Sequence, residues 1–89
     1  MIEREVEIVN RLGLHARAAA KLVHAAGGFQ SRVTVVKDGE EVDAKSILGI
    51  LLLAAGQGSE IIIRCDGADE DEALRAVTTL IANRFDEES

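Results

Sequence analysis

The first third of the chain changes from the period of a strand to the period of a helix. From Ile2 to Val9, apolar residues alternate with three glutamates, which predicts a strand with one buried face. From Ala16 onward the apolar residues follow the i, i+3, i+4, i+7 spacing of an amphipathic helix, at Ala19, Leu22, Val23 and Ala26. The pair Gly27-Gly28 predicts the end of this helix, and residues 10–14 are expected to form the loop before it.

The middle of the chain predicts a hairpin followed by a short helix. Arg32 to Lys37 is rich in β-branched residues and predicts a strand. Asp38-Gly39 is a preferred two-residue turn, because both positions need positive φ, so Glu40 to Asp43 should be the return strand. Ser46 is a good N-cap for a helix from Ile47 to about Leu53, which the flexible residues 56–58 should close.

The last third predicts one more strand and one more helix. Glu60 to Cys65 has the β-branched pattern of a strand, and Asp66-Gly67 should turn the chain. Asp69 and Glu72 resemble a capping box for the last helix. The residues of this helix expected to face inward are Ala73, Leu74, Val77, Leu80 and Ile81. Residues 86–89 are rich in acids and are expected to be a frayed tail.

The predicted order of elements is β-α-β-β-α-β-α. Four strands with three helices on one face form an α+β open-faced sandwich around a single core. At 89 residues the chain has room for only one such core, so we expect one domain spanning residues 1–89. Strand order does not follow from this pattern, and ferredoxin-like folds share the first six elements.

Composition and charge exclude several classes of protein. The formal net charge of −6 and the presence of only two aromatic residues disfavour nucleic-acid binding, which uses cationic surfaces and aromatic platforms. Between Ile8 and Lys37, however, there is no acid. The cations of this stretch are Arg11, Arg17, Lys21, Arg32 and Lys37. The pattern indicates either a surface that meets a negative partner or chance clustering in a short chain.

Cysteine usage and hydropathy favour the cytoplasm. Cys65 is the only cysteine, so no internal disulfide can form, and we expect it to be a small core residue. The charged N-terminus does not resemble a secretory signal, and the longest apolar run, Ile47 to Ala55, is too short to span a bilayer. His15 and His24 lie nine residues apart without other ligands nearby, so neither a metal nor a cofactor is expected.

One histidine stands where a phosphate would bind well. His15 is placed at the start of the first helix, where unpaired backbone N–H groups and the helix dipole favour anions. The same field favours the neutral, nucleophilic imidazole over the imidazolium. Gly13 allows the loop to curl, and the guanidinium of Arg17 can bind phosphate oxygens. Taken alone, the same residues are also compatible with a polar surface histidine, and His24 is expected to be solvated or half-buried.

The second predicted helix is apolar on more faces than it can bury. If Ile50 and Leu53 face the core, then Ile47, Leu48 and Leu51 should be largely exposed. Exposed apolar residues that cluster together indicate a protein-docking surface. A fully buried helix or a homodimer interface are the alternatives.

These segments together resemble a known family. Gly13-Leu14-His15-Ala16-Arg17, followed by residues 45–49 (KSILG) and 58–61 (GSEI), is similar to the HPr family, the histidine-containing phosphocarriers of the bacterial phosphoenolpyruvate-dependent sugar phosphotransferase system. The resemblance covers essentially the whole chain. It implies a four-stranded antiparallel sheet covered on one face by three helices.

The resemblance also implies partners and roles. His15 would accept a phosphoryl group from Enzyme I and pass it to IIA components, and Arg17 would stabilise that group. Ser46 matches the serine that a dedicated HPr kinase/phosphorylase modifies in many bacteria. Matches to the shared docking surface are Ala16, Ala20, Ile47, Leu48 and Leu51. A monomer without membrane or nucleic-acid contacts is expected.

The chain departs from the family pattern at Ala18, which stands where the family usually has proline. Leu51 and Leu52 are more apolar than in many relatives, which bears on partner choice. Two other functions stay open: a regulatory adaptor, of the nitrogen-type or another signalling branch, that acts through its phosphorylation state at Ser46, and a ferredoxin-like domain that binds a small molecule. The second would need a ligand pocket or a fixed oligomer and gives no reason for pairing His15 with Arg17.

Overall fold

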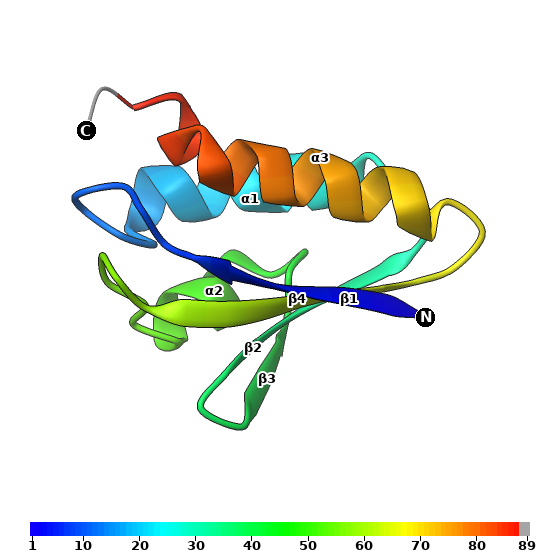
Figure 1. The fold of residues 1–89 in the computed structure, drawn as a ribbon, viewed down its shortest axis with the longest axis horizontal. Helices are drawn as coiled ribbons and strands as arrows, with labels where there is room; N and C mark the ends of the chain where they lie inside the picture. The colour runs from blue at the N-terminus through cyan, green and yellow to red at the C-terminus, as the bar shows by residue number, and fades with distance from the viewer. Residues whose placement is uncertain (88–89) are drawn as a thin grey trace.

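A computed structural model describes residues 1–87 of the chain (Figure 1). Its elements follow the predicted order. They are β1 (Ile2–Glu7), α1 (Ala16–Gly27), β2 (Arg32–Lys37), β3 (Glu40–Asp43), α2 (Ile47–Leu52), β4 (Glu60–Asp66), α3 (Glu70–Ala82) and a terminal 3₁₀ turn η1 (Arg84–Asp86). The α+β open-faced sandwich expected from the sequence is therefore confirmed.

The four strands form one antiparallel sheet in the order β1-β4-β2-β3. The last strand, β4, thus lies between β1 and β2, in the middle of the sheet. Its residues Ile61, Ile63 and Cys65 are buried, and in the register Val33 and Val35 of β2 lie opposite Cys65 and Ile63. A strand with such an apolar face is stable in the centre of the sheet, because both neighbours and the helices exclude water from it.

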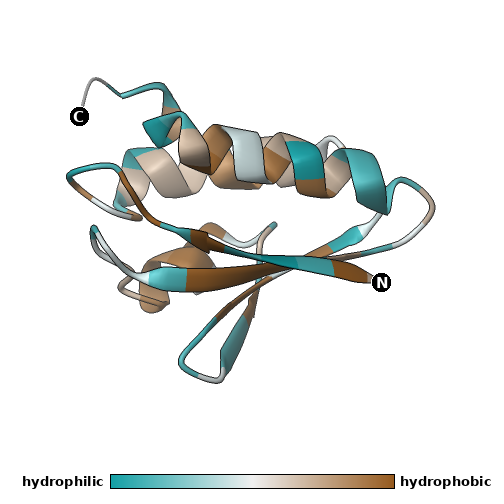
Figure 2. Cartoon of the chain, viewed as in Figure 1, coloured by the Kyte–Doolittle hydropathy of each residue, from teal (hydrophilic) through white to brown (hydrophobic). Residues whose placement is uncertain are grey.

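Two long helices cover one face of this sheet. Helices α1 and α3 lie side by side across it, and the short α2 contacts α1 and β3 (Figure 1). Figure 2 shows hydrophobic residues along the sides of the helices that face the sheet, and α2 is hydrophobic along its length. The core between the layers is built from aliphatic side chains and Phe85. Cys65 is fully buried in it, as predicted, and this burial raises the pKa of its thiol.

The N-terminus of α3 is not capped as predicted. Asp69 occupies the N-cap position, but its carboxylate makes no capping bond within the helix. Instead it accepts hydrogen bonds from the backbone N–H groups of Gln30 and Ser31 and from the Ser31 hydroxyl. The Ser31 hydroxyl is the main reason that the pKa of Asp69 is lowered. The capping-box prediction was wrong because the Asp69 carboxylate binds donors of residues 30 and 31, which are distant in sequence, in place of the helix's own first turn.

Helix α2 ends close to the predicted position, about Leu53. It stops at Leu52, and Ala54 adopts a left-handed conformation with φ 51° before the chain reaches Gly56. No helix within residues 1–87 is both long and apolar enough to cross a membrane.

Candidate functional site

The loop that leads into α1 is fixed by its own backbone and by residues 55–56. Gly13 N donates to Asn10 O at 3.2 Å, and Leu14 N donates to Ala55 O at 2.8 Å. The buried side chain of Asn10 adds a bond from Nδ2 to Gly13 O at 2.8 Å. Gly13 has φ +66°, and a Cβ there would lie 2.5 Å from Ala55 O. Only glycine fits this position, so the sequence expectation of a tight curl before His15 is met.

His15 lies immediately before the first turn of α1. It is the N-cap residue, with φ −76° and ψ 178°, and its side chain makes no capping bond. The first intrahelical bond runs from Ala19 N to His15 O at 2.8 Å, and the first turn contains no acid. The backbone N–H groups before Ala19 therefore have no partner inside the helix, and with the dipole of this 12-residue helix they favour an anion beside the imidazole.

A carboxylate from the end of the chain contacts the imidazole. Glu87 Oε2 lies 2.8 Å from His15 Nε2, and Glu87 Oε1 accepts a hydrogen bond from Asn10 Nδ2 at 2.8 Å. The exposed fractions of the His15 and Glu87 side chains are 26% and 15%. Partial burial alone would raise the pKa of Glu87. The hydrogen bonds from Asn10 and His15, and the nearby positive charge, outweigh burial and hold that pKa below its ordinary value.

The direction of this pKa shift links the contact to stability. A carboxyl whose folded pKa lies below its unfolded value stabilises the fold when the pH is above the unfolded value. That stabilisation is lost as the pH falls through the folded pKa. The hydrogen bonds that Glu87 makes with Asn10 and His15 therefore support the folded chain at neutral pH, and this support is lost in acid.

The prediction of a frayed tail over residues 86–89 is wrong for its described part, residues 86 and 87; residues 88–89 lie outside the described residues. Phe85 is fully buried, and Lys21 Nζ donates to Phe85 O at 2.6 Å. Arg84, Phe85 and Asp86 have φ values of 57°, 53° and 62°, so a left-handed turn follows α3. This turn brings Glu87 to His15. The sequence signal was Phe85 itself, one of only two aromatic residues, placed directly before the acids.

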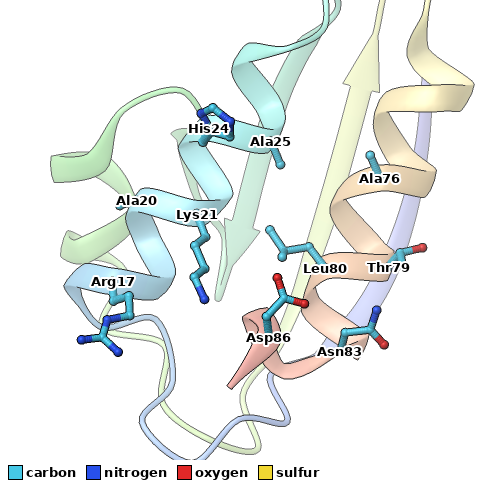
Figure 3. A pocket seen from close by; sticks show the side chains of 10 residues that line it. All are labelled: Arg17, Ala20, Lys21, His24, Ala25, Ala76, Thr79, Leu80, Asn83 and Asp86. Carbon is cyan, nitrogen blue, oxygen red and sulfur yellow. The ribbon is translucent and has the colours of Figure 1, made fainter. Parts of the chain in front are cut away.

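Arg17 lies in the first turn of α1, exposed to solvent, as predicted. It also lines an open cavity of about 600 Å³ between α1 and α3 (Figure 3). Lys21 and the exposed His24 of α1 also line this cavity, as does Asp86, which lies across from Lys21 in Figure 3. The acid-free stretch does not form one surface, because Arg32 and Lys37 lie on β2. Of its cations, Arg17 and Lys21 lie on the helix that His15 begins, and Arg11 lies in the loop before it.

Ser46 and the apolar residues of α2 lie on the helix next to α1. Ser46 caps α2, with its Oγ accepting a hydrogen bond from Gly49 N at 3.1 Å, as the sequence predicts. The exposed fractions of Ile47 and Leu48 are 46% and 67%. On α1, Ala16 and Ala20 are exposed too. These four residues therefore lie on two helices in contact, and we call them the α1–α2 surface.

The expected exposure of Leu51 was wrong. Leu51 is half-buried against the core, whereas Leu52 has an exposed fraction of 67%. The reason is helical spacing: with Ile50 and Leu53 buried, Leu52 falls on the same row as Leu48, four residues earlier, and Leu51 falls on the flank. Leu12, in the loop before His15, is also exposed, and no sequence pattern singled it out.

No cluster of three metal-ligating side chains occurs within the part of the chain that the structure describes. His15 and His24 do not come together with Cys65, which lies in the core. The site is thus an imidazole at an open helix start, with one carboxylate on its Nε2 and cations on the adjacent helical turns.

Comparison with known proteins identifies the family. The family model described as the PTS HPr component phosphorylation site matches residues 2–83. Phosphocarrier protein HPr of Cupriavidus necator is 54% identical over 87 residues, covering 98% of each chain. Phosphocarrier protein NPr of Shewanella violacea is 44% identical and covers 99% of this chain and 97% of its own. A crystal structure of HPr from Thermoanaerobacter tengcongensis superposes with a TM-score of 0.97 at 45% identity, covering both chains fully.

These matches extend over the whole fold, including the third helix, and so decide against a ferredoxin-like ligand-binding domain. The chain belongs to the HPr family, the phosphocarrier proteins of the phosphotransferase system, and is a carrier, not a catalytic enzyme.

Proposed function

We propose that His15 accepts a phosphoryl group from Enzyme I, which obtains it from phosphoenolpyruvate, and passes it to IIA components. The observation that carries this proposal is the imidazole at the open start of α1, with unpaired N–H groups beside it and no acid in the first turn. The same donors that attract the phosphate stabilise it once it is bound to the ring. The chain would act as a single-domain monomer in the cytoplasm.

Docking of both partners is assigned to the α1–α2 surface. Ile47 and Leu48 offer exposed apolar area beside His15's helix, and the small residues Ala16 and Ala20 allow a partner to approach closely. Leu51 borders this surface with its exposed part, and Leu52 extends it. Docking would bury this apolar area, which lies close to the acceptor, and would thereby bring the phosphoryl group of the donor protein to His15.

Incubation with phosphoenolpyruvate and Enzyme I of the host tests the proposal. Mass spectrometry should show one added phosphoryl group, mapped to His15, labile in acid and stable in base. Its transfer to a purified IIA component should regenerate the unmodified chain. Uptake at any other residue, or no uptake with an active Enzyme I, would refute the assignment.

Arg17→Ala is expected to slow phosphoryl transfer while leaving the fold intact. Loss of one charge-assisted hydrogen bond, about 1.5 kcal/mol, corresponds to a rate about 10-fold lower. Arg17 is exposed, so the melting temperature should not change. Stopped-flow transfer assays check this, with Arg11→Ala, an exposed cation in the loop before His15, as control. Equal slowing by both variants would show a general charge effect and remove the specific role of Arg17.

Ser46 is proposed as a site of regulatory phosphorylation by an HPr kinase/phosphorylase. As the N-cap of α2, a phosphoserine would lie at a helix start, where the dipole and N–H groups tolerate it. Its dianion would nevertheless border Ile47 and Leu48, and a partner that covers those residues would have to desolvate it. The modification should therefore weaken docking without unfolding the chain.

Ser46→Asp should keep the wild-type melting temperature and accept phosphate from Enzyme I about 10-fold more slowly, a docking penalty of about 1.4 kcal/mol. Ser46→Ala should show the opposite pattern: normal transfer and a loss of about 1 kcal/mol of stability, because the cap is gone. Ala68→Asp, at an exposed position between β4 and α3 and also just before a helix, is the matched control for added charge. If Ser46→Asp transfers as fast as wild type, Ser46 is a helix cap only.

A second function is a signalling branch of the nitrogen type, in which the phosphorylation state and not sugar uptake is the output. It is favoured by the full-length similarity to a phosphocarrier protein NPr. Competition assays decide between the two: the phosphorylated chain is offered equal amounts of the host's sugar-specific and nitrogen-type IIA proteins, and the preferred acceptor identifies the branch.

A further inference from the structure

The open cavity between α1 and α3 has aliphatic side chains on both of its walls. Ala25 of α1 and Ala76 and Leu80 of α3 line it, and all three are only half-buried (Figure 3). The cavity volume of about 600 Å³ lies within the range of small-molecule sites, about 300–1,000 Å³. An apolar group that entered this space would remove exposed aliphatic area from water, which is favourable.

Two opposite charges line the same cavity without pairing with each other. Lys21 of α1 and Asp86 of η1 lie across from one another in Figure 3. No ion pair within residues 1–87 involves either side chain. Lys21 Nζ donates to Phe85 O at 2.6 Å, and an ammonium has three N–H donors, so two donors are left for a further acceptor. The cavity therefore offers a cation and an anion that a third group can bridge.

We propose that this cavity binds an α-amino acid with an apolar side chain. The carboxylate of the ligand accepts hydrogen bonds from Lys21, and its ammonium donates to Asp86. The apolar side chain of the ligand then lies against Leu80 and the two alanines. A ligand with one charge only would satisfy one of the two charged side chains and would draw the other out of water without a partner, which costs free energy.

The remaining charged groups of the cavity explain why a carboxylate end is favoured on α1. Arg17 and His24 precede and follow Lys21 by about one helical turn, and both are exposed. They make the α1 wall attractive to any anion, so this wall alone would not select a zwitterion. Asp86 is the one carboxylate among the lining residues, and it supplies that selection. His15 does not line the cavity, so the inference does not depend on its proposed function.

Titration of the full chain with L-leucine, followed by two-dimensional NMR of the nitrogen-15-labelled protein, tests the proposal. Saturable shifts are expected at Lys21, Leu80 and Asp86. Isocaproate lacks the ammonium of leucine, isopentylamine lacks its carboxylate, and glycine lacks its apolar side chain. Each should bind at least about 10-fold more weakly than leucine, because each loses one charged hydrogen-bonding group or the apolar body. Leucine should also raise the melting temperature, since it bridges two elements of the folded chain.

Two variants on opposite sides of the cavity separate its charge from its shape. Asp86→Asn, at a left-handed position that Asn tolerates, should weaken leucine binding about 10-fold and leave isocaproate binding no weaker. Ala76→Leu should abolish the binding of both, because the larger side chain fills the space between the helices. The matched controls are Asp71→Asn and Ala82→Leu, which are exposed on α3 outside the cavity and should bind leucine like wild type.

Equal affinities for leucine and isocaproate would overturn the proposal, because the cavity would then accept apolar anions without recognising the ammonium. Absence of saturable shifts with leucine, or unchanged shifts in Ala76→Leu, would show that the cavity is not a ligand site. None of these measurements uses Enzyme I, so their failure is distinct from a failure of phosphoryl transfer to His15.

Discussion

His15→Ala is expected to reduce phosphoryl uptake from Enzyme I to background. The His15 imidazole is the nucleophile placed at the open start of α1, and alanine has no nucleophile to replace it. The unpaired N–H groups and the protonated guanidinium of Arg17 would stabilise a phosphoryl group, but they have no free lone pair to attack phosphorus. The measurement is incorporation of label from phosphoenolpyruvate, with intact-mass spectrometry of each variant.

The fold should survive this change, because the His15 side chain makes no cap and alanine is tolerated at this half-exposed position. His24→Ala is the matched control: it removes the other histidine, exposed on the same helix, and should leave uptake unchanged. Full uptake by His15→Ala, or loss of uptake in His24→Ala, would move the acceptor away from the loop before α1.

Phe85→Ala is expected to lower the free energy of unfolding by about 3–5 kcal/mol, the cost of emptying a fully buried aromatic site. Phe85 has no exposed surface, and it fixes the turn that carries Glu87. Urea denaturation followed by circular dichroism measures the loss. NMR of the folded fraction should also show that His15 no longer contacts Glu87.

Phe29→Ala provides the comparison within the same chain. Phe29 is the other aromatic residue, only partly buried at the end of α1, so its removal should cost less than about 2 kcal/mol. Equal losses for the two variants, or a loss below about 1 kcal/mol for Phe85→Ala, would show that the C-terminal turn is only loosely held. In that case the position of Glu87 on His15 would lose its structural support.

The local sequence pattern predicted most of the secondary structure and about half of the candidate site. The period of two in β1, the helical spacing in α1 and the Asp38-Gly39 turn each depend on neighbours within a few residues. The position of His15 at a helix start, the curl at Gly13 and the cap at Ser46 are local in the same way. Residues that act through their own turn can be predicted from the chain alone.

The tertiary structure decided the contacts between segments that are distant in sequence. Strand β4 pairs with both β1 and β2 because its apolar face meets theirs after folding. Asp69 accepts a hydrogen bond from Ser31 for the same kind of reason, since folding brings that donor to it. Glu87 looked like a solvated tail acid, yet it lies on His15, 72 residues earlier. Its position is set by the burial of Phe85 in the shared core. The free energy of this burial comes from contacts with residues distant in sequence, so a short segment of the sequence does not reveal it. The sequence by itself therefore determined the position of His15 at the start of its helix, and only the fold determined which carboxylate faces its imidazole.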